Sequence, residues 1–236
     1  MKTLGILGGM GPAAGAYFYE RVVALTSADK DGVHIPVILV GDPRIPDRTA
    51  HLCGNGASPL PALLRGLLRL RAAGAEVIAM PCNTAHAYLP LLRGEFAPTV
   101  LHMPALAVRY ACHIGARSLG VLSTRGTQRA GIYQTLAEKA GLPLFTLPAP
   151  SAEQLETLIY RQKAGEEIGE EEYRPFADRL LSAGADRVIL ACTEISWAYR
   201  GARSEGVVDA LEVLARAAIS ACGGMVREEA HRLAVL

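Results

Sequence analysis

The chain has 236 residues, of which 50% are hydrophobic and 20% charged, and its formal net charge is +1. This composition is typical of a globular protein with a sizeable core, in one large domain or two small ones, and argues against disorder. The balanced charge gives no broad basic surface, so nucleic acid is not expected as a partner. No apolar run approaches the roughly 18 residues of a membrane-spanning helix, and the N-terminal LGILGGMGP is too short and glycine-broken for a signal peptide.

The cysteines indicate a reducing compartment. Their number is odd and their spacing wide, which argues against a disulfide framework and for free thiols. We therefore expect a cytoplasmic protein without a membrane partner. The five are Cys53, Cys82, Cys112, Cys192 and Cys222.

In chain order, short β-branched or apolar runs alternate with longer stretches of helical period, which predicts βαβ units with helices on both faces of a parallel sheet. The predicted strands cover residues 3–8, 36–41, 76–81, 99–103, 118–123, 143–147, 186–191 and 206–208. Helix starts are predicted at Pro12, at Ser58-Pro59 as cap and first position, and at a capping box of Ser151 with Gln154. Helix ends are predicted at Gly74, Gly141, Gly165 and Gly184.

Two pairs of segments recur at nearly the same spacing. AGAEVIAMPCNT (73–84) aligns without a gap on AGADRVILACTE (183–194), an offset of 110 residues (192 − 82). TLGILGGMGP (3–12) aligns on SLGVLSTRGT (118–127), an offset of 115 (118 − 3). A common α/β phrase could recur by chance, but two copies of one unit explain both matches and the coincident cysteines. We predict an α/β fold of two pseudosymmetric Rossmann-like lobes with parallel sheets and the active site in the cleft between them.

The end of the chain is expected to return to the first lobe. VVDALEVLARAAISACGG (207–224) has helical period and follows the second copy. The predicted first lobe therefore comprises residues 1–103 and 209–236 and carries Cys82. The predicted second lobe comprises residues 104–208 and carries Cys192.

Each copy ends a predicted strand with a cysteine, at the sheet edge where parallel sheets gather ligands. Unpaired backbone N–H groups at a strand-to-helix turn bind carboxylates and favour a thiolate. Asn83, Thr84 and Thr193 add side-chain donors there. A carboxylate held between two thiols has its α-carbon flanked on both faces. One thiol can then remove the α-proton while the other returns a proton from the opposite face, which inverts the centre.

An ordered set of motifs runs over nearly the full length: LGILGGMGP (4–12), IPDRT (45–49), PCNTAH (81–86), GVLSTRGT (120–127), RQKAG (161–165) and CTEI (192–195). In this set the sequence resembles the aspartate/glutamate racemases, and the set is highly specific although no single motif would be. The resemblance implies racemisation of a small amino-acid substrate by paired cysteines, without a cofactor or metal. It also implies a pseudosymmetric two-domain fold that usually forms a homodimer.

By motif matching, the resemblance implies that Cys82 and Cys192 are the two bases. It further implies contacts to the substrate α-carboxylate and ammonium, and a loop over the pocket that carries Met10. The residues implied to make those contacts are Asn83, Thr84, Thr124 and Thr193.

Arg48 and Lys163 match positions that hold the side-chain carboxylate in family members with acidic substrates. An arginine can grip a carboxylate with two parallel hydrogen bonds, and a lysine adds a point charge. A neutral substrate would leave both cations unpaired. In the alternative reading, Arg48 is a surface charge and Lys163 only neutralises a helix C-terminus.

The sequence departs from the usual family pattern after the second repeat strand. Ala191 stands where glycine is usual before the second cysteine, and Ser196-Trp197 replace a frequent proline-containing continuation. A methyl group or an indole beside the pocket would change its size, which puts the substrate in question. Glu194 follows the second thiol by two residues, and we expect it to orient or tune Cys192.

Three other readings remain open. His86 lies four residues after Cys82 and could join it as a metal pair, although a helix-packing or indirect supporting role fits better because further ligands are missing. GMGPAA (9–14) fits a dinucleotide fingerprint, with Asp42 as a ribose ligand, but that reading leaves the paired cysteines unexplained. The protein could also be a cysteine-dependent isomerase or decarboxylase of another small diacid, or a non-catalytic binding descendant of the fold.

Overall fold

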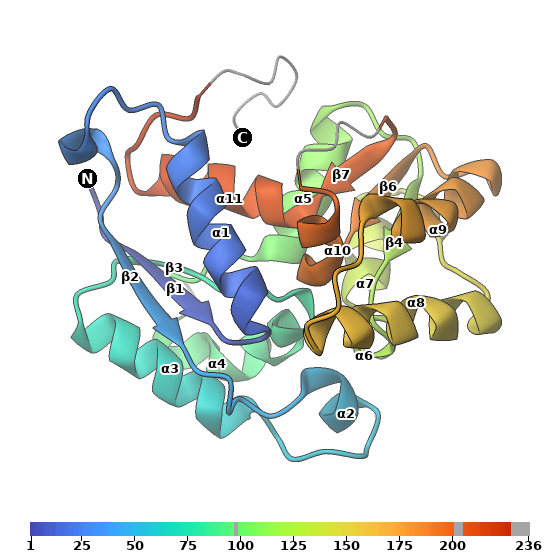
Figure 1. Ribbon diagram of the computed structural model, residues 1–236, viewed down its shortest axis with the longest axis horizontal. Coiled ribbons are helices and arrows are strands. Elements are labelled where there is room, and N and C mark those ends of the chain that lie inside the picture. The colour runs from blue at the N-terminus through green and yellow to red at the C-terminus, as the bar shows by residue number, and fades with distance from the viewer. Residues whose placement is uncertain (97–98, 201–204, 228–236) are drawn as a thin grey trace.

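The computed structural model describes residues 1–96, 99–200 and 205–227. It contains two parallel sheets side by side (Figure 1). The first has the order β2-β1-β3, formed by Val37–Gly41, Leu4–Gly8 and Val77–Ala79. The second has the order β5-β4-β6-β7, formed by Leu144–Phe145, Leu119–Leu122, Arg187–Leu190 and Val207–Asp209. The α/β class with two parallel sheets is confirmed.

Helices connect the strands and cover the sheets (Figure 1). In the first part of the chain they are α1 (Pro12–Leu25), η1 (Asp31–Val33), α2 (Arg48–Leu52), α3 (Leu60–Ala72), η2 (Asn83–Tyr88), α4 (Leu89–Phe96) and α5 (Met103–His113). In the second part they are α6 (Arg125–Arg129), α7 (Ile132–Lys139), α8 (Ala149–Lys163), α9 (Glu170–Ser182), α10 (Thr193–Ala198) and α11 (Ala210–Ala221). No helix within the described residues is long and apolar enough to span a membrane.

The repeated segments occupy matching places in the two sheets. The central strands β1 and β4 carry the first repeat pair, and their neighbours β3 and β6 carry the second. In each half, one more segment pairs at the edge of the sheet and leads directly into a helix. Val100 bridges to Ile78 of β3 before α5, and β7 pairs with β6 before α11. These two helices pack on each other, and α11 also packs on α1 (Figure 1). One buried apolar cluster includes Phe18, Ala107, Val121 and Leu211, so the core runs from one sheet to the other.

Three local predictions are corrected. The predicted strand 99–103 is only one parallel bridge between Val100 and Ile78, because the His102 side chain accepts from Ala105 N and α5 already begins at Met103. The helix predicted at Ser58-Pro59 begins at Leu60, with Pro59 as its cap. The Ser151 capping box is wrong, since α8 begins at Ala149 and places Ser151 inside its first turn.

The predicted helix ends are confirmed. Each of the four glycines follows the C-cap residue of a helix and has a positive φ, between 68° and 111°. Glycine adopts this left-handed conformation without the steric cost that a Cβ adds. The start of α1 at Pro12 is also confirmed.

Candidate active site

The two repeat cysteines occupy equivalent turns. Cys82 follows β3 and is the N-cap of η2, while Cys192 follows β6 and is the N-cap of α10. Both have extended backbone angles, with φ/ψ of −160°/107° and −144°/131°. Both side chains are buried. The first amides of a helix therefore lie directly after each thiol, as the sequence predicts.

Both thiols line one enclosed pocket of about 10 Å³, which is room for about one water molecule. The pocket also contains every other predicted contact residue, so the fold brings together positions from six separate chain segments. Sequence analysis missed Asp47 and Thr49, although both flank Arg48 in the IPDRT motif. The full lining is Met10, Asp47, Arg48, Thr49, Cys82, Asn83, Thr84, Thr124, Lys163, Ala191, Cys192, Thr193 and Glu194.

Arg48 is buried, so it is not a surface charge. One terminal nitrogen donates to the carbonyl oxygens of Ile45 (3.4 Å) and Pro46 (3.2 Å), and the other donates to that of Met10 (2.9 Å). Among the described residues no carboxylate forms an ion pair with it, and its Nε has no hydrogen-bond partner. Burial acts to lower the pKa of Arg48, but Cys82 and Asp47 raise it overall, so the side chain is a fixed cation.

Lys163 supplies the second cation, at the end of α8. Burial acts to lower its pKa, but Glu194 and Cys192 raise it overall, so the ammonium stays charged. Within the described part of the chain, Lys163 makes no ion pair closer than 4.0 Å. Its Nζ lies 4.9 Å from the centroid of the Tyr160 ring, a cation–π contact.

Asn83 is oriented for a ligand by a residue that the sequence gives no signal for. Its Oδ1 accepts from the Tyr133 hydroxyl at 2.7 Å. Its Nδ2 is buried and has no partner among the described residues. Because an unpaired buried donor is costly, this N–H is available to an anion in the pocket.

Three threonine hydroxyls from two separate chain segments meet beside Asn83. Thr84 Oγ1 lies 2.8 Å from Thr127 Oγ1 and 3.2 Å from Thr124 Oγ1. Thr124 is also the N-cap of α6, which packs tightly on α2: a Cβ at Gly126 would lie 2.6 Å from the Thr49 Cα. The hydroxyl contacts therefore join the turn after β3, which carries Thr84, to the turn after β4, which carries Thr124.

Glu194 contacts the second thiol, as expected from its position. The Cys192 thiol donates to Oε2 of Glu194 at 3.0 Å, and the Thr193 hydroxyl lies 3.4 Å from the same oxygen. Burial, and then the charge of Glu194, raise the pKa of Cys192 well above its ordinary value. The resting thiol at this position therefore holds its proton.

The residues four positions after each cysteine support the turns from outside the pocket. His86 Nδ1 lies 2.9 Å from the Cys82 carbonyl oxygen, and its Nε2 accepts from Met103 N at 3.2 Å. Burial lowers the pKa of His86 to about 4, so the neutral ring supports the helix start. Ser196 Oγ lies 3.5 Å from the Cys192 carbonyl oxygen and donates to Asp209 Oδ1 at 2.6 Å. No cluster of three metal-ligating side chains occurs among the described residues.

The two departures from the family pattern have different consequences. Ala191 is buried and lines the pocket, so its methyl group does reduce the space there. Trp197 points elsewhere, since it lines a separate cavity with Glu166 and Arg200. The expectation that the indole changes the pocket is therefore wrong.

Residues 7–218 match the profile of a family described as Asp/Glu/Hydantoin racemase. The chain is 24% identical over 233 residues to the broad specificity amino-acid racemase RacX of Bacillus subtilis, covering 92% of this chain and 96% of RacX. It is 30% identical over 181 residues to glutamate racemase of Deinococcus radiodurans, covering 74% of this chain and 56% of that protein. The structure resembles that of Picrophilus torridus aspartate racemase, with a TM-score of 0.83, 29% identity and 97% of each chain covered.

Proposed function

The chain belongs to the Asp/Glu/Hydantoin racemase family, and we propose that it interconverts the L- and D-forms of aspartate, glutamate or a close relative without a cofactor. The observation that carries this proposal is the pairing of two buried thiols and two buried or half-buried cations in one pocket. The thiols suit two-base proton transfer. The cations suit a substrate with a second carboxylate, because a buried charge is costly without a partner.

In the proposed reaction, the two cysteines work on opposite faces of the α-carbon. One thiolate takes the α-proton, so that the C–H bond breaks and an S–H bond forms. The other thiol gives its proton to the resulting carbanion, so that its S–H bond breaks and a new C–H bond forms on the opposite face. In the reverse reaction, Cys82 and Cys192 exchange roles.

Two groups of lining residues are proposed to bind the substrate. Asn83, Thr84, Thr124 and Thr193 are proposed to hold the α-carboxylate and ammonium, supported by the unpaired Nδ2 of Asn83 and by the helix N-termini beside the thiols. Arg48 and Lys163 are proposed to hold the side-chain carboxylate. Since the terminal nitrogens of Arg48 already donate to backbone carbonyls, its free Nε is the natural donor to the substrate.

Glu194 is proposed to tune Cys192 rather than to touch the α-carbon. Its carboxylate accepts a hydrogen bond from the thiol and so keeps the proton on Cys192 until it is transferred to the α-carbon. Met10 is proposed to cover the substrate, supported by its burial in the pocket wall and by the bond from Arg48 to its carbonyl.

The test is proton NMR in deuterated buffer, with no cofactor added, on both enantiomers of aspartate and glutamate and on several neutral amino acids. Loss of the α-proton signal, with the opposite enantiomer appearing on a chiral column, is the expected result for at least one acidic substrate. Silence across the panel would reject the racemase. Exchange with another small diacid would then favour an isomerase or decarboxylase of that substrate, and binding without exchange would favour a non-catalytic protein.

We propose that the described residues of 1–103 and 209–227 form one lobe and those of 104–208 the other; residues 97–98, 201–204 and 228–236 of the predicted division lie outside the described residues. The packing of α11 on α1 supports this division, although α11 also packs on α5. Hydrogen exchange should show α11 opening together with α1. Opening of α11 with β6 and β7 instead would move the boundary.

The quaternary state and location are also proposals. A homodimer follows from the family resemblance, and sedimentation should give about twice the monomer mass. A cytoplasmic location is supported by five free cysteine thiols, and cell fractionation tests it.

A further inference from the structure

One side of the pocket that holds the two thiols is partly exposed to solvent. Eleven of its thirteen lining residues are buried, and the two that keep partial exposure are Asp47 and Lys163. Both lie at the same junction, Asp47 as the N-cap of α2 and Lys163 as the last residue of α8. The two lining residues that reach solvent therefore both lie between these helices.

Tyr160 closes that junction. Its hydroxyl donates to Oδ1 of Asp47 at 3.1 Å, and its ring lies under the Lys163 ammonium. Burial raises the pKa of Tyr160 to about 12, so the phenol remains a donor at neutral pH. For Asp47, burial acts to raise the pKa, but the bond from Ala50 N and the nearby Lys163 lower it overall, so the acceptor is a carboxylate. The Tyr160 side chain is still 37% exposed, so it has room to move outward.

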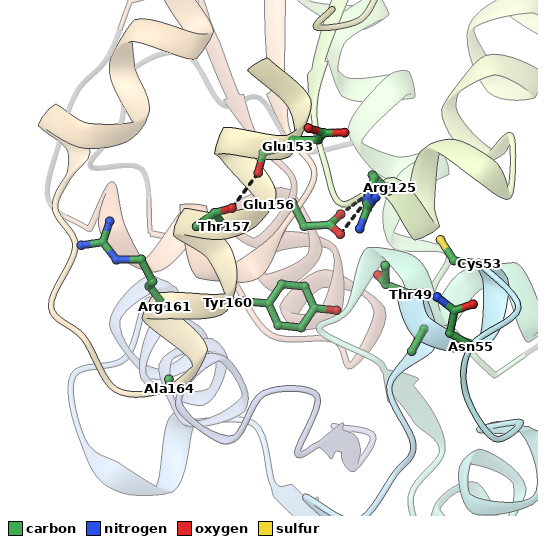
Figure 2. Close-up of a pocket in the computed structure, with 11 residues that line it drawn as sticks. Thr49, Cys53, Asn55, Arg125, Glu153, Glu156, Thr157, Tyr160, Arg161 and Ala164 are labelled. Atoms are coloured by element: carbon green, nitrogen blue, oxygen red, sulfur yellow. Dashed lines mark hydrogen bonds and ion pairs between the residues drawn. The ribbon is translucent and has the colours of Figure 1, made fainter. Parts of the chain in front are cut away.

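A much larger cavity begins on the other side of Tyr160. It measures about 750 Å³ and lies between α2 and α8 (Figure 2). Thr49 lines both this cavity and the catalytic pocket, so the two share a wall. Figure 2 shows the Tyr160 ring extending from α8 toward Thr49, across the space between the helices. The Arg125–Glu156 pair forms its far wall, with Nε and Oε1 2.8 Å apart.

We infer that the α2–α8 cavity is the chamber through which the amino-acid substrate of the proposed racemase reaches Cys82 and Cys192. Tyr160 is the gate, and it opens by leaving Asp47. A pocket of about 10 Å³ cannot admit an amino acid until some wall moves. This wall is the one held by an exposed hydrogen bond and a cation–π contact, whereas the others consist of buried side chains.

The test follows the alkylation of each cysteine by iodoacetamide in the full chain, resolved by peptide mass spectrometry at one mildly alkaline pH. Thr157→Trp places an indole on the cavity wall, and Gln154→Trp is the matched control because it is exposed on the same helix outside the cavity. Exposed Cys112 reports reagent reactivity, and buried Cys222 reports general loosening. We expect Thr157→Trp to slow Cys82 and Cys192 at least about fivefold, with Gln154→Trp and Cys112 unchanged.

Tyr160→Ala should have the opposite effect and speed both thiols about tenfold or more. If Cys222 also reacts faster in that variant, Tyr160→Phe decides instead, since it keeps the ring and removes only the hydroxyl that bonds to Asp47. Unchanged rates of Cys82 and Cys192 in the tryptophan and the gate variants would overturn the route. Because alkylation requires no turnover, a chain that fails to racemise can still support or reject this inference.

Discussion

The surroundings of the two thiols differ although their backbone frames match. Each cysteine ends a repeat strand and caps a helix, and each has a side chain four residues later within 3.5 Å of its carbonyl oxygen. Around Cys82 the charged neighbour is the buried cation of Arg48, whose pKa it raises. Around Cys192 it is first the carboxylate of Glu194, which accepts a hydrogen bond from the thiol, and then the more weakly acting Lys163 ammonium.

The two repeats therefore share their turns but not the charges beside the thiols. A racemase needs two groups that can each serve as acid and base, yet the resting molecule needs only one proton between them. Cys192 has the carboxylate that keeps a proton in place, so Cys192 is the thiol expected to donate that proton when Cys82 removes the α-proton.

Removing a thiol should have the largest effect. We expect Cys82→Ala and Cys192→Ala each to reduce racemisation about a thousandfold or more, because inversion needs a group on both faces. The asymmetry predicts that Cys192→Ala still exchanges the α-proton of one enantiomer with deuterium, through Cys82, faster than Cys82→Ala exchanges that of the other. Chiral chromatography and NMR measure the two quantities. Cys222→Ala, a buried thiol outside the pocket, is the control; near-full activity in either active-site variant would reject the mechanism.

Removing the cation beside Cys82 should come next. Arg48→Ala is expected to lower kcat/KM for acidic substrates about 10- to 100-fold, since a charge-assisted hydrogen bond to the side-chain carboxylate is lost. Neutral amino acids should lose less. Steady-state rates on paired substrates, such as aspartate and alanine, measure the ratio. An equal loss on both would make Arg48 structural, acting through its bonds to Met10 and Pro46.

Neutralising the carboxylate beside Cys192 should have a smaller effect. Glu194→Gln removes a charge that raises the pKa of Cys192, so that pKa should fall while burial keeps it above the ordinary value. The equilibrium constant of a racemase is one, so kcat/KM must remain equal in both directions. The change should appear as kcat values that diverge between L- and D-substrate by up to about tenfold, and as a pH profile shifted to lower pH. Unaltered rates and pH profiles in both directions would reject the role of Glu194.

The sequence alone predicts the duplicated frame well, because the frame depends on local signals. Apolar strands, helix-ending glycines and the two aligned cysteines place the sheets and the thiols. The strand at 99–103 fails because a competing helix start at Met103 shortens it to one bridge. In the second sheet, β7 pairs over three residues with β6.

Most of what distinguishes the two half-sites comes from distant segments that no local pattern marks. The Asn83–Tyr133 and Asp47–Tyr160 hydrogen bonds join residues 50 and 113 positions apart. The backbone anchoring of Arg48 and the direction of Trp197 away from the pocket are likewise consequences of packing. Glu194 was predictable because its partner is two residues away.

The side chains that hold the turns behind the two thiols are His86 on one side and Ser196 with Asp209 on the other. Changes there are expected to affect turnover least, and they compare the two halves through the pH dependence of stability. Burial raises the pKa of Asp209, which holds Ser196, to about 6 from an ordinary 3.8, against the hydrogen bonds of Ser196 and Leu211 that lower it. The folded state then binds more protons than the unfolded state between about pH 4 and 6, so this group makes stability fall as pH rises, by up to about 3 kcal/mol. His86 has the opposite sign, since its pKa of about 4 lies below its ordinary 6.5 and stability rises with pH.

Asp209 and His86 change stability with pH in opposite directions, so the pH dependence of the wild-type protein alone does not separate them. The difference in stability between Asp209→Asn and the wild type gives the contribution of Asp209. Asparagine keeps an oxygen for Ser196 and the α11 amides while removing the buried charge. The variant should match the wild type near pH 4 and exceed it at pH 7 by about 1 to 3 kcal/mol in urea unfolding. Asp178→Asn, an exposed carboxylate on α9, should change stability little at either pH. An Asp209→Asn difference that does not change with pH would mean that the two supports do not titrate in opposite directions.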